Sequence, residues 1–195
     1  MIKQFFASLV MLFKNPDARF SLVGTGLFWA SGTTLRLLLF AWVPAVLLIN
    51  DNQTPANLMG VVSIGIVLGA AAAGLWISLA KVNRALIGGL LLGPVILMLA
   101  FTTSLSSAAI LLVLIGLCGG LFVVPLNALL QERGHETIGA GKALAVQNFV
   151  ENITMLLFIG AYSLASAVIP VSTIVIVFGL VVMVAIGVLA AIRYK

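Results

Sequence analysis

Long apolar segments separated by short polar ones run along most of this sequence. An apolar segment of about 20 residues, folded as a helix, spans a hydrocarbon layer roughly 30 Å thick. The pattern therefore predicts an all-α membrane protein with six transmembrane helices. The expected spans are residues 21–49, 58–80, 85–101, 108–130, 138–165 and 169–192.

The first 20 residues differ from the rest of the chain. Apolar side chains between Ile2 and Phe13 recur at helical spacing, which predicts an amphipathic helix in the membrane interface. A signal peptide is the alternative, because a lysine precedes an apolar stretch, but no small-residue cleavage site follows. Residues 1–20 are thus expected to form an interfacial helix and a linker, and residues 21–195 the six-helix bundle.

Composition excludes a water-soluble domain. Of 195 residues, 63% are hydrophobic and 8% are charged, whereas soluble domains carry roughly 25% charged residues. The single cysteine, Cys118, has no partner within the chain and is expected to be a buried free thiol.

Basic residues are unevenly distributed around the predicted spans, because all except Arg36 lie near the chain ends or in the even-numbered turns. Positive residues stay on the cytoplasmic side, so a multi-pass protein with both termini in the cytoplasm is predicted. The net charge of +5 is then an orientation signal, and no nucleic-acid surface is expected, because no basic cluster lies on a polar face. The basic residues at the chain ends and in the even-numbered turns are Lys3, Lys14, Arg19, Lys81, Arg84, Arg133, Lys142, Arg193 and Lys195.

Several short motifs resemble parts of enzyme signatures, but each is incomplete. His135 and Glu136 begin a zinc-protease motif, yet Gly139 stands where its second histidine belongs. The Gly-Lys pair at 141–142 lacks both the first glycine and the Ser or Thr of a phosphate-binding loop. No catalytic residue, metal site or cofactor is expected, and the chain is not predicted to be an enzyme.

Glycines four residues apart predict close packing between helices, since they let two backbones approach. Three such pairs occur in the second, third and fourth spans: Gly65 and Gly69, Gly89 and Gly93, and Gly116 and Gly120.

Two charged residues fall inside the predicted spans. A charge at the centre of a spanning helix costs about 2.5 to 3.5 kcal/mol, so it persists where it is paired or lines a wet cavity. Arg36 lies about 22 Å beyond Ser21 and Glu151 about 20 Å beyond Ile138, at 1.5 Å per residue. The two are expected at similar depth, either paired with one another or each with a group on another helix.

Amides surround Glu151 and extend the candidate pathway. Gln147, Asn148, Glu151 and Asn152 are predicted to form one polar stripe, either a cavity wall or a set of interhelical hydrogen bonds. The fourth span is expected to close near Gln131, before a short charged turn. The candidate substrate pathway comprises Arg36, Asn127, Gln147, Asn148, Glu151 and Asn152.

Longer strings resemble a known family. RFSLVGTGLFWASGTTLR from Arg19, WVPAVL from Trp42, and VVPLNALLQERG followed by GAGKALAVQNFVEN resemble the C-terminal half of the bacterial LplT lysophospholipid transporters. That family belongs to the major facilitator superfamily. The resemblance implies facilitated inward movement of lysophosphatidylethanolamine-type lipids across the bacterial inner membrane, where a partner acyltransferase-synthetase re-acylates them. From the charges inside the spans together with this resemblance, we expect Arg36 to meet the phosphate and Gln147, Asn148 and Glu151 to contact the headgroup.

Only one half of such a transporter is represented. Superfamily members resemble two six-helix halves with the substrate path between them, so a missing N-terminal half is an implied partner and the chain is a fragment or the product of a split gene. The superfamily's Asp-Arg-Gly signature is degenerate at residues 80–84, where no acidic residue remains. Two alternatives stay open: half of a proton-coupled exporter in which Glu151 titrates, and a membrane scaffold that transports nothing.

Overall fold

The computed structural model describes residues 2–194 and consists of helices. Within that part of the chain, six helices are long and apolar enough to cross a membrane. The predicted six-helix membrane bundle is therefore confirmed. The elements are α1 (Ile2–Lys14), α2 (Pro16–Trp42), a π-helical turn (Val43–Leu47), α3 (Gln53–Trp76), a 3₁₀ helix (Leu79–Arg84), α4 (Ala85–Ala100), α5 (Leu105–Thr137), α6 (Ala140–Ser166) and α7 (Val171–Arg193).

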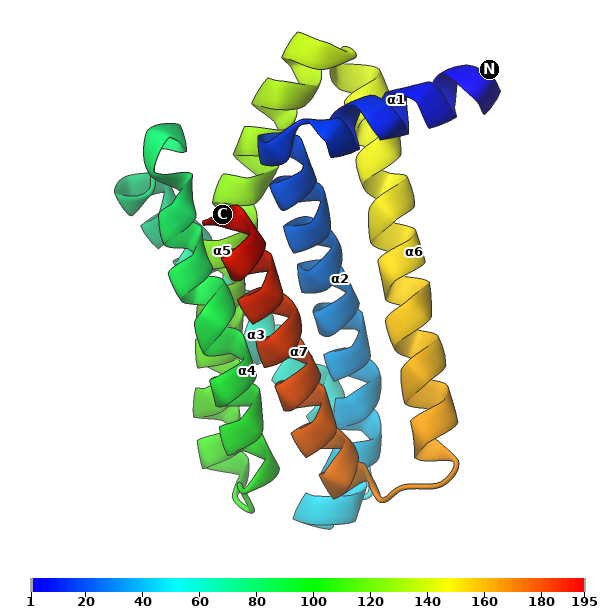
Figure 1. Ribbon diagram of the computed structural model, residues 1–195. Coiled ribbons are helices and arrows are strands. Elements are labelled where there is room, and N and C mark those ends of the chain that lie inside the picture. The colour runs from blue at the N-terminus through cyan, green and yellow to red at the C-terminus, as the bar shows by residue number, and fades with distance from the viewer. Residues whose placement is uncertain (1, 195) are drawn as a thin grey trace.

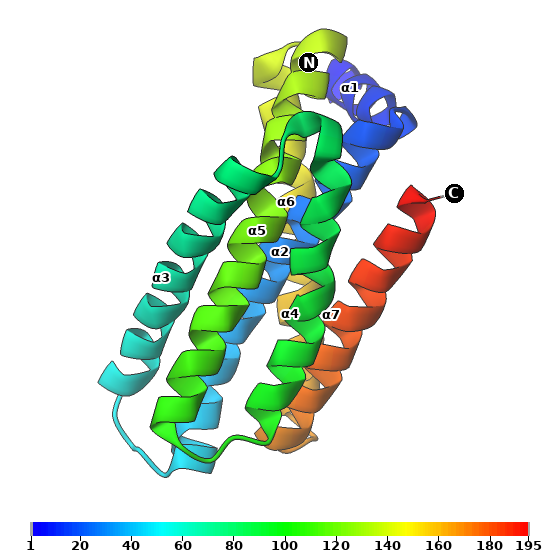
Figure 2. The same cartoon turned by 90° about the vertical axis from the view of Figure 1, so that its left-hand side faces the viewer.

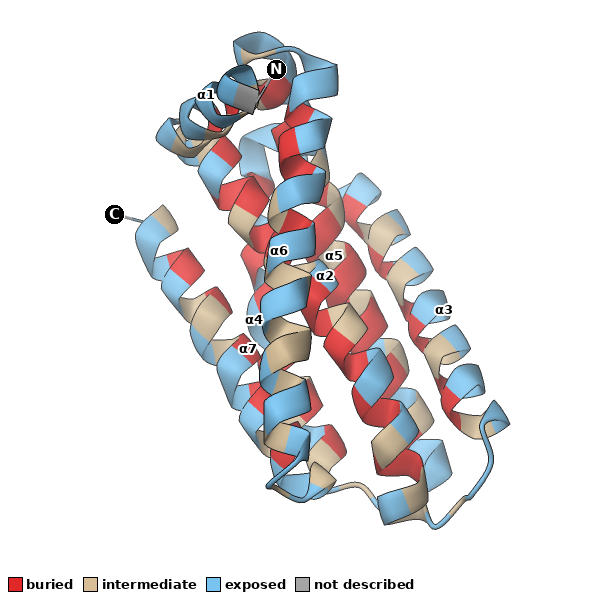
Figure 3. Cartoon of the chain, turned by 90° about the vertical axis from the view of Figure 1, so that its right-hand side faces the viewer, coloured by how far each residue is buried: buried red, intermediate tan, exposed pale blue. Residues whose placement is uncertain are grey.

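Helices α2 and α5 pack against each other and against most of the other spans, so they form the centre of the bundle. Helix α5 packs against α3 and α4, and lies between them in Figure 2, while α2 packs against α6 and α7. Helices α4 and α7 also pack against each other. In Figure 3, α3 lies on one side of the central pair and α7 on the other, with α6 in front of α2. The two termini lie at the same end of the bundle.

Helix α1 crosses the end of the bundle at a steep angle to the spans (Figure 1). Its Leu12 is buried with Leu22 of α2 and Val146 of α6 in a small cluster of their own. The chain turns into α2 at Asn15, whose side-chain oxygen accepts hydrogen bonds from the backbone N–H groups of Asp17 and Ala18 at 3.0 and 3.1 Å. The amphipathic helix is thus present, and its position in the membrane interface stays a prediction.

The cap at Asn15 also corrects one boundary. Helix α2 begins at Pro16, five residues before the expected start of the first span at Ser21. Proline is well suited to the first helical position, because its missing N–H would be unpaired there in any case. The earlier start changes the depth of every residue on α2.

The glycine pairs of α3 and α5 face each other, as their spacing predicts. A Cβ atom on Gly65 or Gly69 would collide with the backbone of α5, and one on Gly116 or Gly120 with the backbone of α3. The contact is backbone against backbone, which only glycine permits. It fixes the position of α3 on one side of the central helix.

The charged segment after Gln131 is helical, and the predicted turn there is wrong. Helix α5 continues to Thr137, and the chain reverses only at Gly139, which has a φ of 89°. Arg133 and Glu136 form an ion pair one turn apart on this extension, at 2.9 Å. A helix pairs its own backbone N–H and C=O groups, so it can continue outside the membrane without apolar side chains.

Candidate functional site

A groove of about 230 Å³ lies between α2 and α3, and Arg36 lines it. The deeper wall is apolar and includes Leu92 and Ile96 of α4 and Ile115 of α5. Trp29 also lines the groove and is 46% exposed. The groove therefore combines one charged group with an apolar interior, which suits an amphiphile.

Among the described residues that line this groove, Arg36 is the one ionisable group. It is exposed, and among the described residues no carboxylate lies within ion-pair distance of it. Two hydroxyl groups on the groove donate to backbone carbonyls, Thr33 to that of Trp29 at 2.9 Å and Ser63 to that of Met59 at 3.1 Å. The guanidinium has five N–H donors and is left to bind an anion.

A second polar group lies inside the bundle between α5 and α6. The Nε2 atom of Gln147 donates to Oε1 of Glu151 at 2.7 Å and to Oδ1 of Asn127 at 2.8 Å. Gln147 and Glu151 are only 8% and 7% exposed. An amide nitrogen has two hydrogens, so one side chain satisfies both acceptors at once. We refer to Asn127, Gln147 and Glu151 as the amide bridge.

The polar stripe predicted on α6 divides into two parts. Gln147 and Glu151 point into the bundle, whereas Asn148 and Asn152 are exposed. The Nδ2 atom of Asn152 donates to the backbone carbonyl of Asn148 at 2.6 Å. Neighbouring positions on a helix differ by about 100° in direction, so the two pairs face different surroundings.

The charges at Arg36 and Glu151 do not lie at the same depth. The hydroxyl of Tyr162 donates to the carbonyl of Leu37 at 3.4 Å, which places Arg36 beside Tyr162. Glu151 lies eleven residues earlier on α6, about 16 Å along its axis. The expected similar depth is therefore wrong, because α2 starts at Pro16 and Arg36 is about 30 Å from that start.

An ionic cluster at the end of the bundle was not expected from the sequence. Asp17 at the start of α2 accepts from Arg133 of α5 at 3.0 Å and from Arg193 of α7 at 2.6 Å. Arg193 also donates from Nε to the side chain of Asn83 at 2.8 Å. Four segments meet at this end. The sequence signal was that each charged residue stands at a helix end on the same predicted side, although spacing alone could not pair them.

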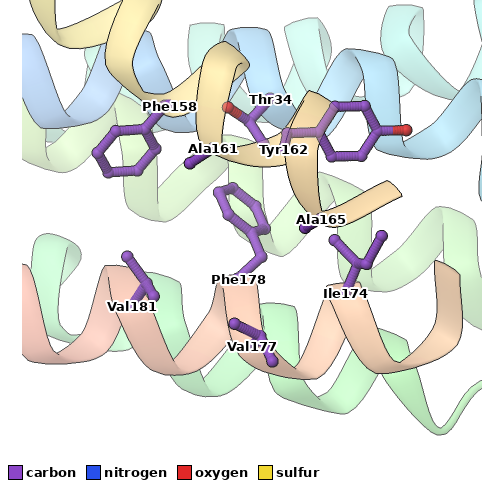
Figure 4. A pocket seen from close by; sticks show the side chains of 9 residues that line it. All are labelled: Thr34, Phe158, Ala161, Tyr162, Ala165, Ile174, Val177, Phe178 and Val181. Atoms are coloured by element: carbon purple, nitrogen blue, oxygen red, sulfur yellow. The ribbon is translucent and has the colours of Figure 1, made fainter. Parts of the chain in front are cut away.

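An apolar crevice of about 160 Å³ opens between α6 and α7, on another face of α2 (Figure 4). Phe158 and Tyr162 of α6 line one side and Phe178 of α7 the other, with Thr34 of α2 behind them. Thr34 is nearly fully buried, and its hydroxyl has no hydrogen-bond partner among the described residues. The described residues that line this crevice include no charged side chain, and the crevice differs in this from the Arg36 groove.

Sequence comparisons identify similar proteins. The lysophospholipid transporter LplT of Salmonella arizonae is 54% identical over 165 residues, which cover 85% of this chain and 42% of the relative. The protein of the same name from Citrobacter koseri is 53% identical over 92% of this chain and 45% of its own length. The chain belongs to the LplT family. No family model matches the sequence.

The LplT comparison explains the size of the bundle. The chain spans less than half the length of the curated relatives it matches. Six membrane-length helices and this coverage correspond to one half of a major facilitator superfamily transporter, as the resemblance implied.

Proposed function

We propose that this chain is the C-terminal half of a transporter that moves lysophospholipids of the lysophosphatidylethanolamine type inward across the bacterial inner membrane. The observation that carries the proposal is Arg36, a cation with no ion-pair partner among residues 2–194, on a groove with an apolar interior. Relatives that bear the name lysophospholipid transporter support the choice of substrate. Arg36 binds the phosphate, and the acyl chain lies along Leu92 and Ile96.

The remaining candidate residues take two separate roles in this proposal. Asn148 and Asn152 are exposed on α6 and contact the headgroup or the second half. The amide bridge holds α5 and α6 together while this six-helix half moves against the other half, because its polar atoms are already bonded to each other. Facilitated movement needs no further energy source.

Transport in vesicles by the two-half protein tests the role of Arg36. Hydrogen bonds to a charged group are worth about 1.5 to 3 kcal/mol, so Arg36→Ala should lower the apparent affinity for the lysophospholipid about 10- to 150-fold. Arg36→Lys should lie in between, because it keeps the charge and loses the bidentate geometry. The matched control is Arg84→Ala, which removes an exposed cation outside the groove. Equal uptake by the variants Arg36→Ala and Arg84→Ala would refute the assignment.

The buried carboxyl group of Glu151 supports a second candidate, the half of a proton-coupled exporter. In that mechanism Glu151, which accepts a hydrogen bond from Gln147 on the same helix, would gain and lose a proton beside the bond from Gln147 to Asn127 that joins α6 to α5. Transport that depends on an imposed pH gradient, and loses that dependence in Glu151→Gln, would favour the exporter. Lysophospholipid uptake unaffected by the gradient would favour facilitated movement.

A scaffold that transports nothing is the third possibility, and co-purification separates it from the other two. The proposal predicts a stable complex with a second six-span chain, the N-terminal half, and lysophospholipid uptake by that complex. An acyltransferase-synthetase that uses the imported lipid would act as a further partner. A chain that stays alone and moves no lipid when the second half is supplied would be a scaffold.

A further inference from the structure

A groove of about 320 Å³ runs between the start of α2 and the end of α7. Phe20 and Val23 form its α2 wall, and Ala185, Val188 and Ile192 form much of its α7 wall. Two arginines, Arg19 and Arg193, lie at one end, where both chain termini are found. This α2/α7 groove is distinct from the Arg36 groove, because Arg36 lies 17 residues beyond Arg19, about 25 Å along α2.

The two arginines of the α2/α7 groove differ in their contacts. Arg193 is held by Asp17 at 2.6 Å and by Asn83 at 2.8 Å, and its guanidinium lies 4.8 Å from the ring centroid of Phe20. Arg19 is exposed, and its side chain makes no hydrogen bond or ion pair with any residue that the structure describes. Asp17 is shared by two arginines, so the groove's polar end keeps a net positive charge.

The chemistry of the walls identifies the occupant. A positive end fits a phosphate, and the apolar remainder fits a hydrocarbon chain rather than a soluble anion. We propose that the α2/α7 groove binds an anionic diacyl phospholipid of the surrounding bilayer. Its phosphate lies on Arg19, and one acyl chain follows Val23, Ala185 and Val188. The lipid joins α2 to α7 at the end where the ionic cluster of Asp17 also joins them.

Native mass spectrometry of the full chain, released from nanodiscs that contain equal phosphatidylglycerol and phosphatidylcholine, tests this site. The parent chain should retain phosphatidylglycerol in preference. A basic residue near a membrane surface contributes about 1 kcal/mol to the binding of anionic lipid, so Arg19→Gln should weaken phosphatidylglycerol retention about fivefold and abolish the preference. Arg84→Gln removes an exposed cation elsewhere at the same end and should leave the preference intact.

A second variant tests the apolar wall. Ala185→Phe fills the groove and should lower retention of both lipids, in a chain whose helix content and thermal transition are checked first. Equal loss of preference in Arg19→Gln and Arg84→Gln would overturn the proposal, because general basicity would then explain binding. Competition by glycerol 3-phosphate as strong as that by phosphatidylglycerol would also overturn it, since the hydrocarbon chain would then contribute nothing.

Discussion

The amide bridge predicts a measurable coupling between two buried residues of α6. Gln147→Met keeps the length of the side chain and removes the donor to Glu151 and Asn127. A buried acceptor left without a partner costs about 1 to 3 kcal/mol. A hydrogen bond between helices in a membrane averages about 0.6 kcal/mol. The substitution should therefore lower the free energy of unfolding by about 1.5 to 3.5 kcal/mol.

Glu151→Met should cost less, because Gln147 keeps its bond to Asn127. In the double variant neither the donor nor its buried acceptor remains. Its cost should fall short of the sum of the two single costs by about 1 to 3 kcal/mol. The free energies can be measured by titrating micelles of the purified chain with dodecyl sulfate and following tryptophan fluorescence.

Asn148 and Asn152 provide a matched control at the same spacing on the same helix. The side chain of Asn152 bonds the backbone of Asn148 rather than its side chain, so methionine substitutions at the two positions should be additive. Costs for the Gln147 and Glu151 pair that add to within about 0.5 kcal/mol would refute the bridge.

Three other substitutions test the packing and the helix ends. Gly116→Val should lower the free energy of unfolding by about 1 to 3 kcal/mol, because its side chain would collide with the backbone of α3 at Val62. Gly74→Val, where a Cβ atom meets nothing, should have little effect in the same dodecyl sulfate titration. Asp17→Asn should cost about 1 kcal/mol, since it weakens two partly exposed ion pairs, and the loss should shrink in high salt. The backbone N–H of Thr54 in the first turn of α3 donates to Asp51 at 2.6 Å and lowers the pKa of that carboxyl group. This hydrogen bond should weaken as the pH falls through the lowered pKa, and amide exchange at the start of α3 should then quicken.

The bundle could be predicted because its signals are local. Apolar length specifies a spanning helix wherever the segment stands in the chain, and all six were found in this way. The facing glycines of α3 and α5 were also predictable, since a contact between backbones needs small residues at a fixed spacing. Helix ends were less accurate, as the continuation of α5 to Thr137 shows. A helical segment outside the membrane need not be apolar, so hydropathy does not mark where it ends.

The candidate site was only partly predictable, because its geometry depends on neighbours distant in the sequence. The side chains of Gln147 and Asn148 are adjacent amides, and nothing local indicates that the first meets Asn127 while the second stays exposed. The ionic cluster around Asp17 similarly joins residues up to 176 positions apart. Sequence spacing identified which polar residues needed an explanation. The assignment of partners required the packing of α5 against α6.

The exposed amides of α6 indicate how that helix is used. Helix α6 packs chiefly against α2, and most of its other surface is exposed (Figure 3). In hydrocarbon, each unsatisfied polar group is costly, and the bond from Asn152 to the backbone of Asn148 occupies only one of the several donors and acceptors on the two side chains. These amides would therefore be unfavourable on a surface of α6 that faced only lipid. Their place on the flank of the α2 and α5 pair therefore favours a protein surface or a wet cavity opposite them, which is what a second half of the transporter would supply.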